Sequence, residues 1–258
     1  MPLAASLAFL GTAPADPVPA QSDPRAVALG REMIAALGGE AAWDKARLFR
    51  FDFVVLREGK EASRSRHVWD RYTGDYRLQG VDKAGAPYTV YFNVNSRSGT
   101  VFVNGRPAEG EARDALVKTA YGRFVNDSYW LLAPWKIFDP GVTLAHDGEK
   151  PCPGELPGGN LCDVLRLSFG ETVGLTPKDV YWMWITREGR RLVGWQYVVG
   201  GAQEPPSTAL WKDWQTFEGV ALSLQKEVLG RPIVLAFENV SVAASTDPAL
   251  LTPPTPSP

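Results

Sequence analysis

Cysteine and histidine are scarce in this chain, which has 258 residues and only two of each. Two cysteines are too few for a structural zinc site, which takes four ligands. The sequence also lacks a Gly-x-Ser-x-Gly turn, a His-Glu-x-x-His helix and a glycine loop that could hold a phosphate. The two histidines, His67 and His146, give little material for a catalytic triad. We therefore expect no metal site, no cofactor and no enzymatic activity.

A surplus of charge is missing as well, because the net charge is only −2. Binding to nucleic acid or to anionic lipid surfaces depends on concentrated lysine and arginine. We therefore expect no nucleic-acid partner. No apolar run approaches the roughly 18 residues of a membrane-spanning helix.

Several carboxylates lie near the most apolar segment of the chain, among them Asp127, Asp139 and Asp147. A pair of carboxylates can act as general acid and base. Capping, turn formation and solubility are simpler roles for such residues. A hydrolase that uses Asp127 or Asp139 is therefore the least favoured of three functional hypotheses.

Residues 1–21 contain a short apolar run from Leu3 to Leu10, followed by small residues and prolines. This order is typical of an export signal with a small-residue cleavage site. No lysine or arginine precedes the apolar run, so a disordered N-terminal tail is the alternative.

The two cysteines, Cys152 and Cys162, flank a loop rich in proline and glycine. Such a loop can bend the two thiols together, and we expect a disulfide. Disulfides persist in oxidising compartments, which agrees with an export signal. Free thiols of a cytosolic protein are the alternative. We expect a periplasmic or otherwise exported location.

Alternating apolar residues and turn signals predict that most of the chain forms strands. A helix is expected from Pro24 to Leu37, ended by Gly38 and Gly39, and a second from about Glu109 to Trp130, where Pro134 prevents continuation. The predicted strands are Leu48–Leu56, His67–Tyr72, Tyr76–Val81, Tyr88–Val94, Thr100–Val103, Val142–Ala145, Cys162–Phe169, Asp179–Arg187, Arg191–Val199, Ser207–Phe217, Val220–Val228 and Ile233–Val242. Their short connections favour an antiparallel sheet.

We interpret residues 22–246 as one α+β domain, a broad and strongly curved antiparallel sheet whose concave face is covered by helices. Residues 247–258 are rich in proline and are expected to be disordered. The segment Phe124–Pro140 is the most aromatic stretch in the middle of the chain, and it needs a large apolar surface to cover it.

Aromatic residues are abundant, with nine Trp, eight Tyr and eleven Phe. Large rings fill cores or line apolar pockets, and the sequence leaves both possibilities open. Trp182 and Trp184 share one face of a predicted strand, and Trp195 and Tyr197 share a face of the next. Paired across a hairpin, they would form an aromatic wall. The candidate ligand-binding residues are Arg50, Phe51, Trp69, Tyr91, Trp130, Trp135, Trp182, Trp184 and Trp195.

Arg50 and Asp52 lie opposite three phenylalanines, Phe49, Phe51 and Phe53, on the first predicted strand. If that face lined a cavity, Arg50 could orient a ligand carboxylate or bind a helical lid. A cross-strand ion pair is the simpler interpretation.

The order of these elements resembles the periplasmic lipoprotein-carrier superfamily, the LolA/LolB-like proteins. The resemblance rests on the helix end at Ala36–Gly39, on Trp43 before a phenylalanine-rich strand, and on the segments Asp127–Lys136, Trp211–Leu222 and Ile233–Val242. The central segment is similar to a helix of exported bacterial members that have not been characterised.

The resemblance implies an unclosed β-barrel whose mouth is plugged by helices and whose apolar cavity holds acyl chains. It also implies that an arginine on an early strand helps to hold the lid, and Arg50 is the nearest match by position. The cysteine-flanked loop, the proline-rich tail and the aromatic central segment depart from the family, so the resemblance does not identify lipoprotein as the cargo.

The leading hypothesis is an exported, non-enzymatic binding protein that holds a lipid, an acyl chain or another apolar ligand between a curved sheet and a helical lid. The second hypothesis is a cell-envelope interaction or assembly module with a filled core. We expect a monomer that makes transient contact with a membrane or an envelope protein.

Overall fold

The computed structural model describes residues 21–154, 161–170, 178–201 and 205–255. All but the last residue of the predicted export signal, most of the loop between the two cysteines and the last three residues of the tail lie outside these ranges.

The described chain has three α-helices, thirteen strands and two short 3-10 helices. The helices are α1 (Pro24–Ala36), α2 (Glu40–Lys45) and α3 (Gly110–Leu132), and the 3-10 helices are η1 (Ala133–Lys136) and η2 (Pro248–Leu250). The strands are β1 (Leu48–Arg57), β2 (Lys60–Asp70), β3 (Asp75–Val81), β4 (Pro87–Asn93), β5 (Ser98–Val103), β6 (Arg106–Ala108), β7 (Val142–Pro151), β8 (Leu161–Phe169), β9 (Val180–Thr186), β10 (Leu192–Val198), β11 (Ser207–Phe217), β12 (Val220–Val228) and β13 (Ile233–Ala243).

All thirteen strands belong to one curved sheet, in the order β6-β5-β4-β3-β2-β1-β13-β12-β11-β10-β9-β8-β7. Neighbouring strands are antiparallel, and β1 pairs with β13, so the first and last strands meet in the middle of the sheet. Strands β6 and β7 are the two edges and do not pair. The predicted fold class, an unclosed antiparallel barrel with helices, is confirmed.

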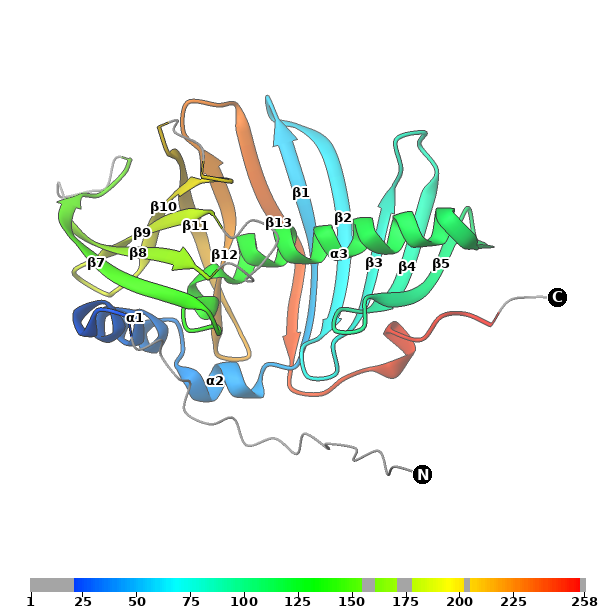
Figure 1. Ribbon diagram of the computed structural model, residues 1–258, viewed down its shortest axis with the longest axis horizontal. Coiled ribbons are helices and arrows are strands. Elements are labelled where there is room, and N and C mark those ends of the chain that lie inside the picture. Colours follow the sequence, from blue (N-terminus) through cyan, green and yellow to red (C-terminus); the bar gives the residue numbers. More distant parts are fainter. Residues whose placement is uncertain (1–20, 155–160, 171–177, 202–204, 256–258) are drawn as a thin grey trace.

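Helix α3 connects the two edges of the sheet and crosses its concave face (Figure 1). Pro134 lies two residues beyond the end of the helix, where the chain continues as the 3-10 helix η1. Proline cannot extend an α-helix without losing a hydrogen bond and clashing with the preceding turn. The long predicted helix and its stop are therefore both confirmed.

The N-terminal helix α1 begins with Pro24, and the side chain of Asp23 accepts a hydrogen bond from the backbone N–H of Arg25 as its cap. The backbone N–H of Asp23 donates to the carbonyl of Leu144, which fixes the start of the helix against β7. Helices α1 and α2 lie together along the lower edge of the sheet near β7 and β12 (Figure 1).

Strand β2 begins seven residues before the predicted position, at Lys60 instead of His67. Its first half is polar and shows no apolar alternation, so only its pairing with β1 defines it. Strand β7 likewise continues to Pro151, beyond the predicted end at Ala145, because it pairs with β8. Helix α2 was not predicted, since it is only six residues long and has no buried residue.

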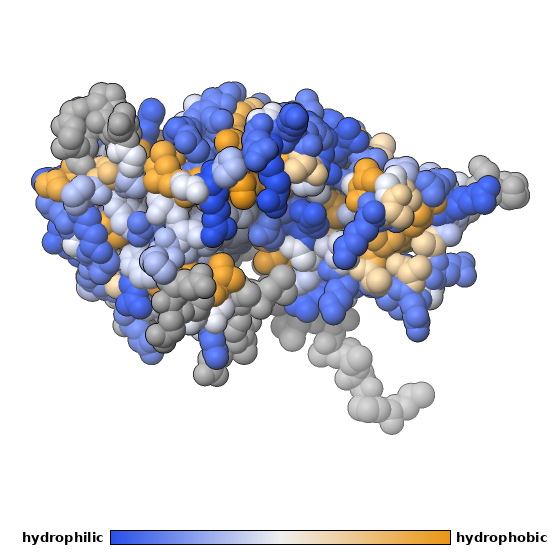
Figure 2. Space-filling view, turned by 90° about the horizontal axis from the view of Figure 1, so that it is seen from above, coloured by the Kyte–Doolittle hydropathy of each residue, from blue (hydrophilic) through white to orange (hydrophobic). Residues whose placement is uncertain are grey.

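The main core lies between the concave face of the sheet and the helices, and it contains Phe49, Phe51 and Phe53 of β1. The face shown in Figure 2 is mostly hydrophilic, and its hydrophobic residues lie in separate groups. Within the part of the chain that the structure describes, no helix is long and apolar enough to cross a membrane.

Cys152 and Cys162 form a disulfide, as predicted, with 5.1 Å between their Cα atoms. The disulfide packs in a small cluster separate from the main core, together with Trp182 and Trp184. In the C-terminal segment for which we expected disorder, Pro248–Leu250 forms the 3-10 helix η2, which is capped by the carboxylate of Asp247.

Candidate functional site

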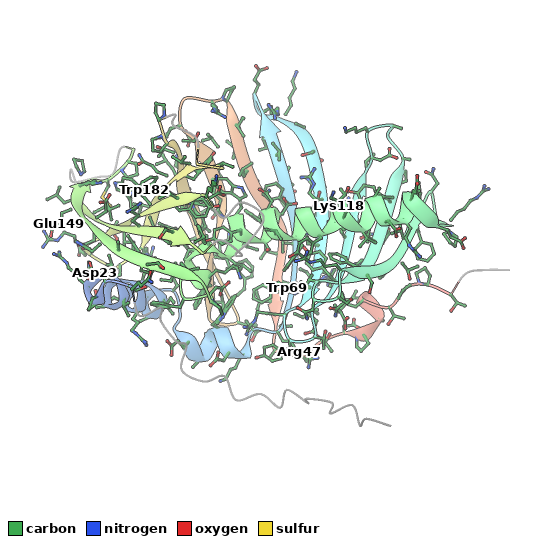
Figure 3. All side chains as sticks on the ribbon, viewed as in Figure 1. Asp23, Arg47, Trp69, Lys118, Glu149 and Trp182 are labelled. Atoms are coloured by element: carbon green, nitrogen blue, oxygen red, sulfur yellow. A yellow bond between two sulfur atoms is a disulfide. The ribbon has the colours of Figure 1, made fainter. Side chains whose placement is uncertain are left out.

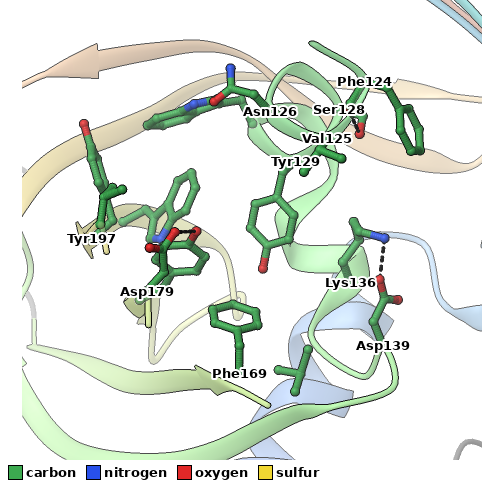
Figure 4. Close-up of a pocket in the computed structure, with 15 residues that line it drawn as sticks. Phe124, Val125, Asn126, Ser128, Tyr129, Lys136, Asp139, Phe169, Asp179 and Tyr197 are labelled. Carbon is green, nitrogen blue, oxygen red and sulfur yellow. Dashed lines mark hydrogen bonds and ion pairs between the residues drawn. The ribbon is translucent and has the colours of Figure 1, made fainter. Parts of the chain in front are cut away.

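A cavity of about 480 Å³ lies between the C-terminal half of α3 and the strands β7 to β10 (Figure 4). We call it the aromatic cavity, because seven of its lining side chains are aromatic. It is lined by Phe124, Val125, Asn126, Ser128, Tyr129, Trp130, Lys136, Asp139, Val142, Phe169, Asp179, Tyr181, Trp195, Tyr197 and Val199. Its volume falls in the range of small-molecule sites.

The strand register builds one wall of the aromatic cavity. Tyr197 of β10 pairs with Tyr181 of β9, and Trp195 lies two residues before Tyr197 on the same face. The ring of Trp130, which comes from α3, meets Trp195 edge to face with 4.4 Å between ring centroids. Tyr129 lies 5.7 Å from Tyr181 by the same measure. Helix and sheet are thus joined by rings around an open space.

Two polar atoms at this wall are buried and have no hydrogen-bond partner, the hydroxyl of Tyr129 and the indole Nε1 of Trp195. Burial raises the pKa of Tyr129 well above its ordinary value, so the hydroxyl stays protonated. A buried donor without an acceptor costs free energy. Both atoms belong to side chains that line the cavity.

The charged groups that line the cavity are already engaged. Lys136 forms an ion pair with Asp139 three residues later. Asp179 accepts hydrogen bonds from the Tyr181 hydroxyl at 2.7 Å and from the backbone N–H of Gly200 at 2.6 Å. Burial and the bond to Asp179 raise the pKa of Tyr181. The cavity lining is therefore mostly aromatic and apolar, and its charged side chains already have partners within the protein.

The same part of α3 also packs closely on β2 and β3, where Phe124 meets Trp69 and Tyr76 edge to face. Phe51 stacks on His67 with 4.5 Å between ring centroids, and the Nδ1 atom of His67 lies 2.6 Å from the Tyr76 hydroxyl. The Nε2 atom of His67 lies 3.2 Å from Oδ2 of Asp127 on α3, close enough for an ion pair but not aligned for a hydrogen bond. Both side chains are fully buried. We call Tyr76, His67 and Asp127 the buried polar cluster.

The predicted site residues are divided between the two halves. Trp130 and Trp195 line the aromatic cavity. Trp69 packs edge to face on Phe124 of α3, and Phe51 is in the core. Trp135 stacks on Trp43 and donates its indole N–H to the carbonyl of Ala221. These three rings hold helices on the sheet and do not line the cavity.

The predicted aromatic wall of Trp182, Trp184, Trp195 and Tyr197 is not formed. Trp184 pairs with Gly194 and Trp182 with Gln196, so both face the side opposite to Trp195. They pack near the disulfide. In Figure 3, Trp69 lies beneath α3 and Trp182 at the other end of the sheet. Register decided this outcome, because a shift of one residue moves a side chain to the other face.

Arg50 and Tyr91 lie on the outer face of the sheet. Phe49 and Phe51, the neighbours of Arg50, point into the core, so Arg50 itself is exposed on the convex side. It therefore does not contact α3 as a lid-holding arginine would. Asp52 pairs with Arg64 at 2.9 Å, so the predicted cross-strand ion pair exists with a different arginine. Tyr91 packs edge to face on Phe102.

The two carboxylates considered for catalysis are separated by the architecture. Asp127 is enclosed in the buried polar cluster, and Asp139 lines the aromatic cavity beside Lys136. Among the described residues, no group of three His, Cys, Asp or Glu side chains could hold a metal ion.

Sequence reasoning missed several residues of the cavity, including Tyr129, Phe169 and Tyr181. Tyr129 precedes Trp130 on the helix, and the aromatic segment could have pointed to it. Tyr181 alternates with Trp182, but which of the two faces the cavity follows only from the pairing of β9 with β10.

No known protein family has a model that matches this chain, and no curated protein sequence matches it. Solved structures do resemble it. A LolA superfamily protein from Nitrosomonas europaea superposes with a TM-score of 0.50 at 10% identity, over 83% of this chain and 97% of that one. A domain from Vibrio parahaemolyticus described as an outer membrane lipoprotein-sorting domain has a TM-score of 0.46 at 6% identity, over 87% of this chain and 95% of that one.

The lipoprotein LppX from Mycobacterium tuberculosis has a TM-score of 0.31 at 12% identity, over 85% of this chain and 97% of that one. At 10% identity, the Nitrosomonas europaea superposition shows a shared fold and nothing more. The half-open sheet, the helix across its concave face and the Nitrosomonas europaea superposition together define a LolA-like fold.

Proposed function

We propose that the protein binds an apolar ligand, such as a lipid or an acyl chain, in the aromatic cavity and does no covalent chemistry on it. The observation that carries the proposal is the cavity itself. About 480 Å³ of space lies between α3 and the sheet, and seven aromatic rings line it. A LolA superfamily protein superposes over 97% of its own chain, which supports a carrier-type fold.

The polar atoms near the cavity restrict the class of ligand that we expect. The unpartnered donors of Tyr129 and Trp195 favour a ligand that brings a hydrogen-bond acceptor, such as an ester or amide carbonyl, next to its apolar part. Satisfying both donors adds specificity to the hydrophobic contact. We further propose that the protein acts outside the cytoplasm, a location that the Cys152–Cys162 disulfide supports.

We propose that helix α3 moves when a ligand enters or leaves the aromatic cavity. A ligand that replaces ring contacts between α3 and β10 exchanges one set of apolar contacts for another. The open and closed arrangements can therefore differ by little free energy, and the ligand shifts their populations by its preference for one of them.

The test is native mass spectrometry of gently purified protein, followed by titration with a fluorescent fatty acid. We expect one ligand per chain, and we expect Trp130→Ala to weaken binding at least tenfold. Trp182→Ala is the matched control, because it removes a half-buried tryptophan from the opposite face of the sheet. A protein that carries no ligand and binds no fatty acid would instead favour the envelope interaction module.

A further inference from the structure

A second cavity, of about 290 Å³, lies on the convex face of the sheet, away from α3. Its lining includes three arginines from adjacent strands, Arg50 of β1, Arg66 of β2 and Arg77 of β3, together with the polar residues Asp52, His67, Gln79 and Asn239. We call the three arginines the arginine triad. The strand register explains the grouping: Arg50 and Arg77 both pair with Val68, which lies between them.

The spacing of the triad follows from sheet geometry. Arg50 and Arg77 stand two strands apart, roughly 10 Å between backbones, and Arg66 lies two residues along β2, roughly 7 Å from Val68. Long arginine side chains at these positions can converge over Val68, which is small and buried and leaves the hollow above it. Three guanidinium groups thus surround one space.

Two of the three charges are uncompensated. Within the described part of the chain, neither Arg50 nor Arg77 forms a hydrogen bond or ion pair, and the Nε atom of Arg77 is buried without a partner. Arg66 has one distant contact, 3.6 Å to Asp52. A buried guanidinium donor without an acceptor costs free energy, so an acceptor from solvent or from a ligand would stabilise it.

The nearby carboxylates are engaged elsewhere. Asp52 binds Arg64 at 2.9 Å and Asn239 at 3.1 Å. Asn239 is at a bulge of β13, with a positive φ of 51°, and the extra residue turns its side chain toward Asp52. On the other side, Asp75 of β3 accepts hydrogen bonds from Thr73 and Asn93. Asp52 lines the same cavity, but within the described residues neither Asp52 nor Asp75 pairs with Arg50 or Arg77.

We propose that the arginine triad is a binding site for a phosphate group on the convex face, separate from the aromatic cavity. The excess of two positive charges matches a phosphomonoester, which carries close to two negative charges, better than a single carboxylate. Guanidinium groups bind phosphate oxygens through paired, charge-assisted hydrogen bonds. The phosphate belongs either to a small solute or to the headgroup of a lipid at a membrane surface.

The test is calorimetric titration with inorganic phosphate, together with sedimentation of phosphatidylcholine vesicles with and without phosphatidic acid. We expect phosphate to bind and Arg50→Gln to weaken binding roughly tenfold, and the double variant Arg50→Gln/Arg77→Gln on the order of a hundredfold. Arg57→Gln is the matched control, since Arg57 is an exposed arginine of the same strand. Arg50 is exposed, so the single variant folds and carries the test if the double variant does not.

The outcomes distinguish a small phosphate ligand from a lipid headgroup, and a third set of outcomes contradicts the proposal. Phosphate binding that the triad variants lose and Arg57→Gln keeps supports a small phosphate ligand. Binding only to phosphatidic acid vesicles, with the same pattern of variants, supports a lipid headgroup. No binding to either probe, equal binding of acetate and phosphate, or equal loss in Arg57→Gln overturns the proposal.

Discussion

One helix closes two halves of the sheet in different ways. Over β1 to β3, α3 buries the polar cluster of Tyr76, His67 and Asp127 and packs rings on rings. Over β7 to β10, it leaves the aromatic cavity. Both halves of the sheet carry large aromatic side chains, so the difference lies in where the strands and the helix place them. We infer that the half of the sheet formed by β1 to β3 anchors α3, and that the half formed by β7 to β10 binds the ligand.

The comparison predicts that equal substitutions have unequal effects in the two halves. Trp69→Ala removes a buried ring from the anchoring half, and we expect it to lower the free energy of unfolding by about 3–5 kcal/mol. Trp130→Ala removes a half-buried ring beside empty space, and we expect a loss of about half that size. Urea unfolding of both variants measures the difference, and equal losses would contradict the division.

The buried polar cluster is expected to help hold α3 on strands β1 to β3, and a substitution in it tests this role. Asp127→Ala removes the carboxylate beside Nε2 of His67 and leaves only Tyr76 as its buried polar partner, and we expect the free energy of unfolding to fall by about 3 kcal/mol. The control is Arg123→Gln, because Arg123 is partly exposed and 3.9 Å from Asp127, and its loss is expected to cost under about 1 kcal/mol. An Asp127→Ala protein as stable as the parent would show that the cluster does not hold α3.

Lys226 lies on β12, between the two halves of the sheet, and its substitution tests how that region contributes to stability. It is fully buried, its Nζ atom lies 4.3 Å from the ring centroids of Trp211 and Phe237, and burial lowers its pKa well below the ordinary value. The unfolded chain therefore binds a proton that the folded chain binds weakly, so stability falls as the pH drops below about 10, until the folded-state pKa is passed.

We expect Lys226→Met to be more stable than the parent at pH 7, by about 2 kcal/mol, and to gain less at pH 10. Urea unfolding at the two pH values measures both gains. A methionine variant that is less stable at both pH values would mean that the ammonium group and its two rings stabilise the fold.

The smallest expected effect concerns Tyr129. Its hydroxyl is buried without a partner, so Tyr129→Phe should raise the stability of the empty protein by about 1 kcal/mol. The same change should weaken binding of a ligand with a carbonyl acceptor and leave binding of a pure hydrocarbon unchanged. Thermal unfolding and competition titrations measure these effects, and lower stability would indicate that the hydroxyl has a partner in solution.

Much of the fold was predictable because strand alternation is local. The bounds of β11 and β12 agree with the prediction residue for residue, and α3 differs by one or two residues at each end. The polar start of β2 was not predictable, since pairing with β1 alone makes Lys60–Arg66 a strand.

The site was predictable only in part, because it depends on register and on distant contacts. The aromatic segment pointed to Trp130, and alternation pointed to Trp195. The opposite orientation of Trp182 follows from its pairing with Gln196, and the contact of His67 with Asp127 joins residues 60 positions apart. Neither follows from local pattern.

The central claim, that the space beside the second half of α3 is a binding site, is tested most directly by filling it. Val125 of α3 lines the aromatic cavity, and Val125→Trp places a large ring there without removing any ring already present (Figure 4). In a titration with a fluorescent fatty acid, we expect the parent to bind one molecule per chain and the filled variant to bind at least tenfold more weakly, with an unchanged melting temperature. Equal binding by both proteins would contradict the account.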